Sequence, residues 1–411
     1  MSRIRIGSFY SSKLRIKSES SSNFPYLGTM EHHPESTRVS DVIIIGGGLA
    51  GLCSAIDLSG KGLSVQLFEK EAYPRHKVCG EYVSNETLPY LSSLGIDPFD
   101  MGAVHISELE FSGPDGDCLK TELPLGGFGI SRFRLDYALY EKACEEGARI
   151  EQDRVESIDF KNDEFLVRTR KGQVFSSRFV IGAFGKRSTM DKKLDRQFIR
   201  KKSSYVAVKA HYKGVFPENL VGLHNFEGGY CGVSNVEDRK LNICYLVNYE
   251  VFQRYKDMNA FQEEVLKQNK QLASVLSNAQ MIFEKPLTIS QISFDRKELL
   301  VDHILMCGDS AGLIHPLCGN GMGMAIGGAR LVSEVILSYF NGQLKSREEV
   351  EKHYVRSWNQ NFRTRLRTGH SIAALLRFYK ISFFLLPVLR RFPSLLHRLI
   401  KLTHGKPVVV I

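Results

Sequence analysis

Three glycines with the spacing of a phosphate-binding turn follow the first strand-like run of the chain. Gly46, Gly48 and Gly51 form a G-x-G-x-x-G motif between the apolar stretch "DVIII" and the helix-like stretch "LAGLCSAIDLSGKG". The first glycine permits a tight turn, the second lets the backbone approach a pyrophosphate, and the third allows close helix–sheet packing. The free N–H groups and positive dipole end of such a helix favour a phosphate group.

An acidic residue completes this motif. Glu69 ends the next strand-like run, "SVQLFE", eighteen residues after Gly51. Its carboxylate is placed to accept hydrogen bonds from ribose hydroxyls, and it disfavours a 2′-phosphate. The order strand, helix, strand and terminal acid therefore predicts a dinucleotide site for FAD or NAD rather than NADP, and we include Lys70 in it. The alternative interpretation is a Gly-rich turn that binds no ligand.

A distal segment decides between FAD and NAD. The stretch "ILMCGDSAGLIHPLCGNGMGMAIGGA" contains a Gly-Asp pair, a Pro and a Gly-rich helix start. It resembles the second flavin signature of the para-hydroxybenzoate hydroxylase-like FAD enzymes. The resemblance implies that Asp309 binds the ribitol chain of FAD and that the backbone at Gly321 and Met322 approaches the flavin pyrimidine. A helix N-terminus there would stabilise negative charge on the reduced ring. The alternative is an ordinary buried Asp and a glycine-permitted helix–sheet contact.

Two middle segments resemble the geranylgeranyl reductase family of flavoproteins. "KVCGEYVSNETLPYLSSLGI" is similar to that family's Lys-x-Cys-Gly-Glu run, and "GISRFRLDYALYEKACEEGARI" is similar to its Arg-x-x-Leu/Phe-Asp-x-x-Leu helix. The resemblance implies that Gly80 and Arg132 contact FAD and that Val155 lies near the adenine. The motifs span most of residues 40–340, and they are specific for FAD but much less so for the substrate.

One thiol and one imidazole are candidates for chemistry beside the flavin. Cys79 could tune or protonate the isoalloxazine, and the neighbouring Lys77 would favour its thiolate form. The simpler interpretation is a small residue that lines the flavin pocket. His315 could relay protons, although a packed loop residue is the interpretation we prefer.

Three departures from related motifs limit the reaction. "GAFGKRSTMD" has Phe184 where aromatic hydroxylases carry the Asp of an Ala-Asp-Gly run, which disfavours hydroxylation, although Lys186 and Arg187 could offer charge to a phosphate. The single tryptophan, Trp358, is far from the place of the halogenase Trp-x-Trp signature. The Trp/Phe-Pro motif of geranylgeranyl reductases is missing from "GGYCGVSNVEDRKLNICYL". This disfavours reduction of a prenyl chain itself, and we predict a related lipophilic substrate instead.

Charge and cysteine content exclude other classes. The 411 residues carry a formal charge of +10, and no acidic residue follows Glu351. Residues 363–406 contain seven Arg and three Lys, so the remainder is balanced and nucleic acid is a poor partner for the main body. The eight cysteines form no C-x-x-C pair and no zinc spacing. We therefore expect no metal site, reduced thiols and a cytoplasmic location, or a peripheral one on the inner membrane face.

The basic C-terminal region is also apolar. Its longest uncharged run is about nine residues, too short to span a bilayer. Arg398 and Lys401 lie among a group of residues predicted to share one side of a helix: Leu395, Leu396, Leu399, Ile400 and Leu402. This pattern fits a segment at the surface of an anionic membrane. The alternative is a helical cap over the substrate domain.

The elements predict an α/β fold, with mixed α+β character and several parts. A discontinuous Rossmann-like FAD-binding domain comprises residues 39–108, 128–190 and 285–345. An inserted antiparallel-sheet substrate domain comprises 109–127 and 191–284, and 346–411 form a basic, apolar helical tail. Residues 1–38 are rich in Ser and predicted to be disordered. They are either a gene-start artefact, with Met30 as the true initiator, or a targeting extension.

The sequence thus predicts an enzyme that uses FAD. Our first hypothesis is an FAD-dependent oxidoreductase that reduces or desaturates a lipophilic small molecule through flavin N5. The first alternative is an FAD-dependent monooxygenase that uses O2 and NAD(P)H as a transient electron donor. The second is a membrane-peripheral electron-transfer flavoprotein.

Overall fold

The computed structural model describes residues 38–201, 203–255, 257–376 and 386–408. The predicted N-terminal extension, with its alternative start at Met30, lies outside the described residues except for Arg38, as do residues 377–385 of the predicted tail. All the described residues belong to one compact unit.

The nucleotide-binding half is built on a parallel sheet. Strand β1 (Arg38–Ile45) pairs in parallel with β2 (Val65–Glu69) on one side and with β9 (Val174–Gly182) on the other. The side chains of Val42–Ile44 and of all of β2 are buried, as expected for parallel strands covered on both faces. Helix α1 (Leu49–Gly60) packs between two further helices, α3 (Arg132–Glu145) and α8 (Gly321–Phe340).

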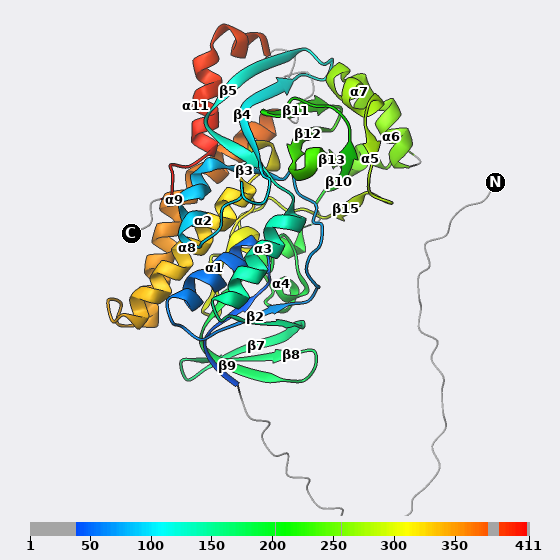
Figure 1. Ribbon diagram of the computed structural model, residues 1–411. Helices are drawn as coiled ribbons and strands as arrows, with labels where there is room; N and C mark the ends of the chain where they lie inside the picture. The colour runs from blue at the N-terminus through cyan, green and yellow to red at the C-terminus, as the bar shows by residue number, and fades with distance from the viewer. Residues whose placement is uncertain (1–37, 202, 256, 377–385, 409–411) are drawn as a thin grey trace, which may run out of the picture. The chain divides into compact units, whose positions relative to one another are not determined.

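This first sheet has the strand order β16-β17-β9-β1-β2-β6, with β7 and β8 extending it from β9 (Figure 1). The alternating stretch "RVESIDFKNDEFLVRTRKGQVFSSRFVIGAFG", with turn signals at "KND" and "RKGQ", predicts an antiparallel meander. The structure confirms it, because β7–β8 and β8–β9 are antiparallel pairs. The remaining strands of the sheet are β6 (Arg149–Gln152), β7 (Val155–Lys161), β8 (Glu164–Thr169), β16 (Leu300–Val301) and β17 (Ile304–Met306).

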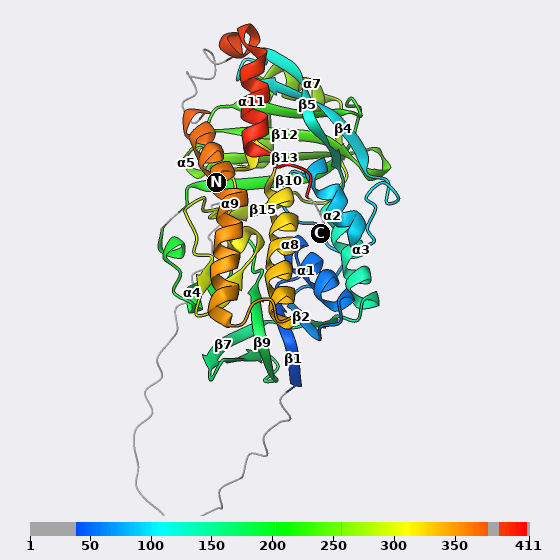
Figure 2. The same cartoon turned by 90° about the vertical axis from the view of Figure 1, so that its left-hand side faces the viewer.

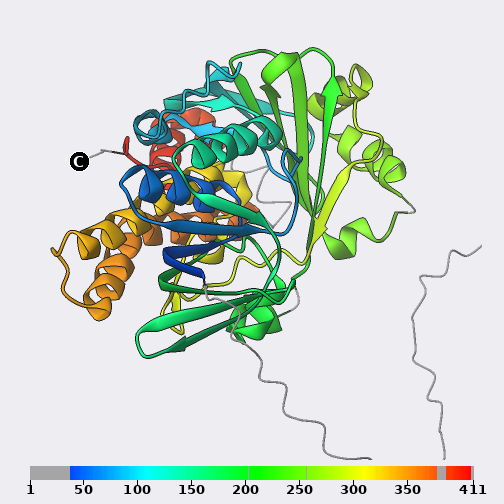
Figure 3. The ribbon, with the colours of Figure 1, turned by 60° about the horizontal axis from the view of Figure 1, so that its bottom comes forward.

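The second sheet has nine strands, in the order β14-β10-β13-β12-β11-β4-β5-β3, with β15 also paired to β10 (Figure 3). It is antiparallel, as predicted for the substrate domain, except where β4 and β11 run parallel. Its strands are β3 (Tyr82–Ser84), β4 (Val104–Ser112), β5 (Cys118–Gly129), β10 (Tyr205–Lys213), β11 (Leu220–Phe226), β12 (Gly229–Val236), β13 (Lys240–Asn248), β14 (Gln280–Met281) and β15 (Leu287–Ser290).

Short helices cover the outer face of this sheet. The polar helix expected near 258–275 is divided into α6 (Met258–Glu264) and α7 (Lys270–Ser277), which follow α5 (Tyr249–Phe252). Asn269 causes the division, because its side chain accepts from the N–H groups of Gln271 and Leu272 and so starts a new helix. The shorter helices of the first half are α2 (Leu88–Ser93) and α4 (Thr189–Lys193).

The C-terminal region is largely helical where the structure describes it (Figure 2). Helix α9 (Arg347–Leu376) packs along α8, with Phe362 close to Gly327. Helix α11 (Pro393–Thr403) packs against β5 and α9. Among the described residues, no helix combines the length and apolar character that crossing a membrane requires.

The five apolar residues lie on one side of the last helix, as predicted, but only part of that side reaches the second sheet. Leu396 and Ile400 are buried against the second sheet, whereas Leu395 and Leu402 are 39% and 41% exposed. The helix turns about 100° per residue, so residues 395 and 402 lie on a face that does not reach the sheet. The tail is therefore a cap over the substrate half with an apolar outer edge.

Candidate cofactor and substrate site

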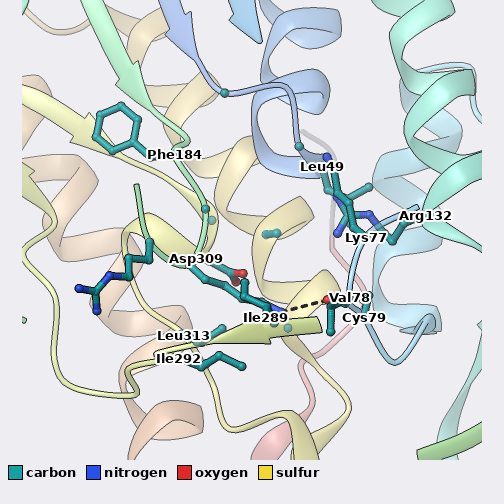
Figure 4. Close-up of a pocket in the computed structure, with 18 of the residues that line it drawn as sticks. Leu49, Lys77, Val78, Cys79, Arg132, Phe184, Ile289, Ile292, Asp309 and Leu313 are labelled. Atoms are coloured by element: carbon teal, nitrogen blue, oxygen red, sulfur yellow. Dashed lines mark hydrogen bonds between the residues drawn. The ribbon is translucent and has the colours of Figure 1, made fainter. Parts of the chain in front are cut away.

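A cavity of about 860 Å³ is lined by residues from both halves of the molecule (Figure 4). It reaches from the glycine turn after β1 to the start of α8. The structure brings the predicted site residues together in its wall: Gly46, Gly48, Glu69, Lys70, Cys79, Gly80, Arg132, Val155, Asp309, Gly321 and Met322. The exception is Gly51, which packs behind the turn.

The glycine turn has the close approaches that its sequence predicts. Gly46 has a φ of +113°, and a Cβ there would lie 2.1 Å from the carbonyl oxygen of Ala183, the residue after β9. A Cβ on Gly51 would lie 2.0 Å from the carbonyl oxygen of Gly46. These two glycines therefore let the turn and α1 pack tightly, which leaves the backbone at Gly48 to face the cavity.

The space beside Gly48 fits a pyrophosphate. The Arg132 Nη2 and Lys77 Nζ atoms lie 3.8 Å and 4.0 Å from the position of a Cβ on Gly48, and no side chain caps the start of α1. Both cations bind one buried carboxylate, Asp136, at 2.6 Å and 2.7 Å. Two cations against one anion leave a positive charge beside an uncapped helix start, which suits an anionic ligand. The quoted motifs contain Lys77, Arg132 and Asp136, but only the fold shows that the two cations share this one carboxylate.

Glu69 braces the glycine turn as well as lining the cavity. Its Oε2 accepts a hydrogen bond of 2.9 Å from the Gly47 N–H, and its Oε1 pairs with Arg75 at 3.0 Å. Burial would raise the pKa of this carboxyl, but Arg75, Lys77 and a backbone N–H hold it below its usual value. Tyr73, which the sequence did not single out, donates its hydroxyl to the Gly47 carbonyl at 2.6 Å. Contact between Glu69 and a ribose remains a prediction.

The flavin end of the cavity is built around the loop between β17 and α8. Asp309 points into the cavity (Figure 4), and no side chain caps the start of α8 at Asn320. Lys297 holds this loop by donating to the carbonyls of Asp309 and Lys186 at 2.7 Å and 3.0 Å. Burial lowers the pKa of Lys297 to about 8. Lys297 carries no motif, so sequence reasoning missed it.

Lys186 crosses the cavity. Its Nζ donates to the carbonyl of Val78 at 3.1 Å. The dashed line in Figure 4 ends at this carbonyl. The two residues belong to segments that are far apart in the sequence, so this bond closes one side of the cavity. Phe184, at the position of the hydroxylase Asp, packs its ring beside Gly182 on β9.

The two candidates for chemistry have different surroundings. Cys79 is half-buried in the cavity wall, and its backbone carbonyl accepts from Asn242 at 3.2 Å. A catalytic role for its thiol remains a prediction. His315 is buried, its Nδ1 accepts from the Leu317 N–H, and its ring lies 4.7 Å from that of Phe294. Burial lowers the pKa of His315 to about 4, which fits a neutral packed residue.

An apolar chamber opens from the flavin end toward the second sheet. Buried and half-buried side chains from strands and loops line it: Ala207, Tyr230, Leu246, Ile289, Ile292 and Leu313. Figure 4 shows Ile289, Ile292 and Leu313 below Asp309. This chamber is suited to hold a hydrocarbon group beside a cofactor in the main cavity.

One cluster in the cavity wall has the composition of a metal site. The ligand atoms of His76, Glu81 and His211 all lie within 4.8 Å of one another. However, the ammonium group of Lys209 lies 2.5 Å from Glu81. Lys209 therefore already supplies the positive charge that the buried carboxylate needs, and a divalent cation would have to compete with it.

The fold and the cavity together define a flavoprotein, and comparison with known families agrees. The profile of the FAD binding domain family matches residues 39–349, so the chain belongs to this family. FAD is its cofactor, and the chain is an FAD-dependent oxidoreductase. This confirms the resemblance to the hydroxylase-like and geranylgeranyl reductase-like flavoproteins.

The relatives span several activities. Conditioned medium factor receptor 1 of Dictyostelium discoideum is 24% identical and aligns over 83% of this chain and 71% of its own length. Digeranylgeranylglycerophospholipid reductase 1 of Methanopyrus kandleri is 22% identical over 82% of this chain and 90% of its own. The structure of the flavin-dependent brominase Bmp2 has a TM-score of 0.74 and 19% identity, with coverage of 90% and 94%. The brominase shares the fold, although the Trp-x-Trp signature is missing here.

Proposed function

We propose that this protein uses FAD to reduce or desaturate a lipophilic, isoprenoid-like or polyketide-like small molecule. Bound FAD would supply hydride transfer through its N5 position. The residues of the chain bind and orient the two reactants: Lys77 and Arg132 beside the pyrophosphate, Asp309 beside the ribitol, and the apolar chamber around the substrate. For reduction, a two-electron donor such as NAD(P)H would reduce the flavin; for desaturation, the flavin would take two electrons from the substrate and pass them to an acceptor such as a quinone.

The apolar chamber is the observation that carries this proposal. Tyr230 contributes aromatic surface to its lining. The other lining side chains are hydrocarbon and carry no charge: Ala207, Leu246, Ile289, Ile292 and Leu313. Burying an alkyl chain there would contribute about 25 cal/mol for each Å² removed from water. The relative named as a digeranylgeranylglycerophospholipid reductase gives further support, because that name describes reduction of a lipid.

Anaerobic reduction of the FAD-loaded protein tests the proposal. We expect that reduced flavin is reoxidised without oxygen by a prenyl-lipid or quinone extract, and that mass spectrometry finds a lipid with two added hydrogens. Ala207→Phe, which fills the chamber, should abolish this reoxidation while FAD stays bound. Reoxidation by oxygen alone, with an oxygenated product, would instead establish the monooxygenase alternative.

We further propose that helix α11 contacts an anionic membrane surface from which such a substrate is taken. Phe392, Leu395 and Leu402 are 57%, 39% and 41% exposed. Arg398 and Lys401 are exposed on the same helix. Exposed apolar groups beside cations are the composition that binds to an anionic bilayer interface. This contact would place the protein peripherally on a membrane.

A further inference from the structure

The segment Val78–Glu81 is held by side chains that lie far away in the sequence. The Val78 carbonyl accepts from Lys186, and the carbonyls of Cys79 and Gly80 accept from one amide, Asn242, at 3.2 Å and 2.8 Å. All four residues of the segment line the cavity. Three successive carbonyls therefore have side-chain donors, which fixes the path of this backbone.

Glu81 makes the strongest of these attachments. It is 0% exposed, and its Oε1 accepts from Lys209 Nζ at 2.5 Å and from the Arg132 N–H at 2.8 Å. Its Oε2 lies 2.6 Å from His211 Nε2. Burial would raise the pKa of this carboxyl, but His211 and Lys209 hold it below its usual value. The carboxylate thus joins the segment to the substrate sheet and to the start of α3.

The backbone at Glu81 shows that this attachment is maintained against strain. Its φ is +55°, in the left-handed region that non-glycine residues rarely adopt. Such a conformation costs on the order of 1 kcal/mol and persists only where the surroundings impose it. Three charge-assisted hydrogen bonds to one buried carboxylate are enough to impose it.

The partners of Glu81 lie on the same sheet face as the apolar chamber. In the antiparallel pair of β10 and β13, Ala207 is opposite Leu246, Lys209 is opposite Cys244, and His211 is opposite Asn242. Because side chains alternate along a strand, these residues share one face. The intervening residues, among them Val208 and Tyr245, belong to the core under α6 and α7. One end of this face forms the chamber wall, and the other end binds the 78–81 segment.

We propose that Glu81 is a positioning residue for the flavin. Through Lys209 and His211 it fixes the cavity-lining backbone of Val78–Gly80 against the same β10–β13 face that forms the chamber wall. The backbone beside the flavin and the wall beside the substrate are then one rigid body. The link between this backbone and the substrate rests on the proposed function, because it assumes that the chamber holds the substrate. The positioning of the flavin by Glu81 concerns only bound FAD.

Glu81→Gln tests the proposal on the FAD-loaded full-length chain without any substrate. The variant keeps the side-chain shape but leaves the Lys209 ammonium without its anionic partner. We expect the dissociation constant for FAD to rise about tenfold. We also expect a changed absorption band of the bound flavin and a shifted midpoint potential. Asn242→Leu, which removes two donors to the segment without leaving a buried charge, should change all three readouts in the same direction by less.

Asp57→Asn is the matched control. Asp57 is another buried carboxylate, which accepts from Tyr90 at 2.7 Å and pairs with Lys61 at 2.9 Å, but it does not line the cavity. It should lower thermal stability while FAD affinity, spectrum and potential stay unchanged. The proposal is overturned if Glu81→Gln matches wild type in these three readouts, or if Asp57→Asn alters them as much.

Two other experimental results would also test the proposal. If Glu81→Gln does not fold, Asn242→Leu decides, and wild-type FAD affinity and potential in that variant overturn the proposal. If no lipid reoxidises the wild-type flavin but Glu81→Gln still shifts its potential, the proposed substrate is wrong and the positioning role of Glu81 stands.

Discussion

The glycine-turn end of the cavity and its flavin end are built from segments with very different separations along the chain. At the glycine-turn end, Gly46, Gly48 and Glu69 lie within one strand–helix–strand unit, and close backbone contacts fix their arrangement. At the flavin end, Val78, Lys186 and Asp309 come from three distant segments held together by side-chain hydrogen bonds. The first end depends on backbone packed closely against backbone, within this unit and against Ala183, and the second depends on hydrogen bonds made by polar side chains.

This difference teaches where substitutions should be tolerated. A backbone packed against backbone cannot adjust to an added methyl group, whereas a side-chain hydrogen bond can be lost with partial compensation. The glycine-turn end should therefore be rigid toward changes of size, and the flavin end should respond to changes of charge.

The largest effect should come from Gly46→Ala. Its Cβ would lie 2.1 Å from the Ala183 carbonyl at a φ of +113°, so the turn must shift. We expect a loss of about 3 kcal/mol or more in the free energy of unfolding and no FAD retained on purification. Gly328→Ala inside α8 is the control, because Gly328 does not line the cavity and the nearest atom to a Cβ there is Cys307 Sγ, at an ordinary contact distance of 3.4 Å. A yellow, stable Gly46→Ala protein would contradict the comparison.

The next effect concerns the pH dependence of stability at the flavin end. Burial lowers the pKa of Lys297 from 10.5 to about 8 in the folded chain, so between these values the unfolded chain binds more protons. Stability contributed by this group therefore rises as the pH rises through that window, by up to about 3 kcal/mol. Urea titrations should show a smaller rise for Lys297→Met than for wild type. Equal rises in both proteins would contradict this assignment.

A smaller effect should follow Glu69→Gln. The change weakens the bond to the Gly47 N–H and breaks the ion pair with Arg75. We expect about 2 kcal/mol less binding free energy for FAD, measured by fluorescence titration. Glu71→Gln is the control for a nearby exposed carboxylate. An unchanged affinity would show that backbone packing alone maintains the turn.

The smallest effect should be seen on helix α11, outside both ends of the cavity. Arg398→Gln removes one exposed cation, worth about 1 kcal/mol at an anionic surface. Sedimentation with phosphatidylglycerol vesicles should show about fivefold weaker binding, and phosphatidylcholine vesicles should bind neither protein. Lys161→Gln, an exposed cation on β7, should bind like wild type. Equal binding of all variants would remove the proposed membrane contact.

Sequence reasoning found the local parts of this site because their constraints are local. The tight turn at Gly46, the strand–helix–strand order and the glycine-rich start of α8 follow from steric rules that act within a few residues. The meander of β7, β8 and β9 was likewise evident, because alternating residues and two turn signals specify it. Lys77 and Arg132 also lay inside quoted motifs. Asp136 was not recognised as the carboxylate that the two cations share.

Only the tertiary structure decided which polar residues meet across the molecule. Glu81 lay inside the quoted Lys-x-Cys-Gly-Glu run, but no signal linked it to Lys209 and His211, because strand β10 and the 78–81 segment are more than a hundred residues apart. The split of the predicted helix at Asn269, whose amide donates to Ser112 Oγ and to the Asn225 carbonyl, and the exposure of Leu395 and Leu402 were also set by contacts with the second sheet. The sequence alone predicted a dinucleotide-binding glycine turn, since backbone sterics leave few alternatives there, and the resemblance of the distal segment pointed to FAD. The shape of the chamber depended on how two sheets pack, which is a sum of many weak long-range contacts.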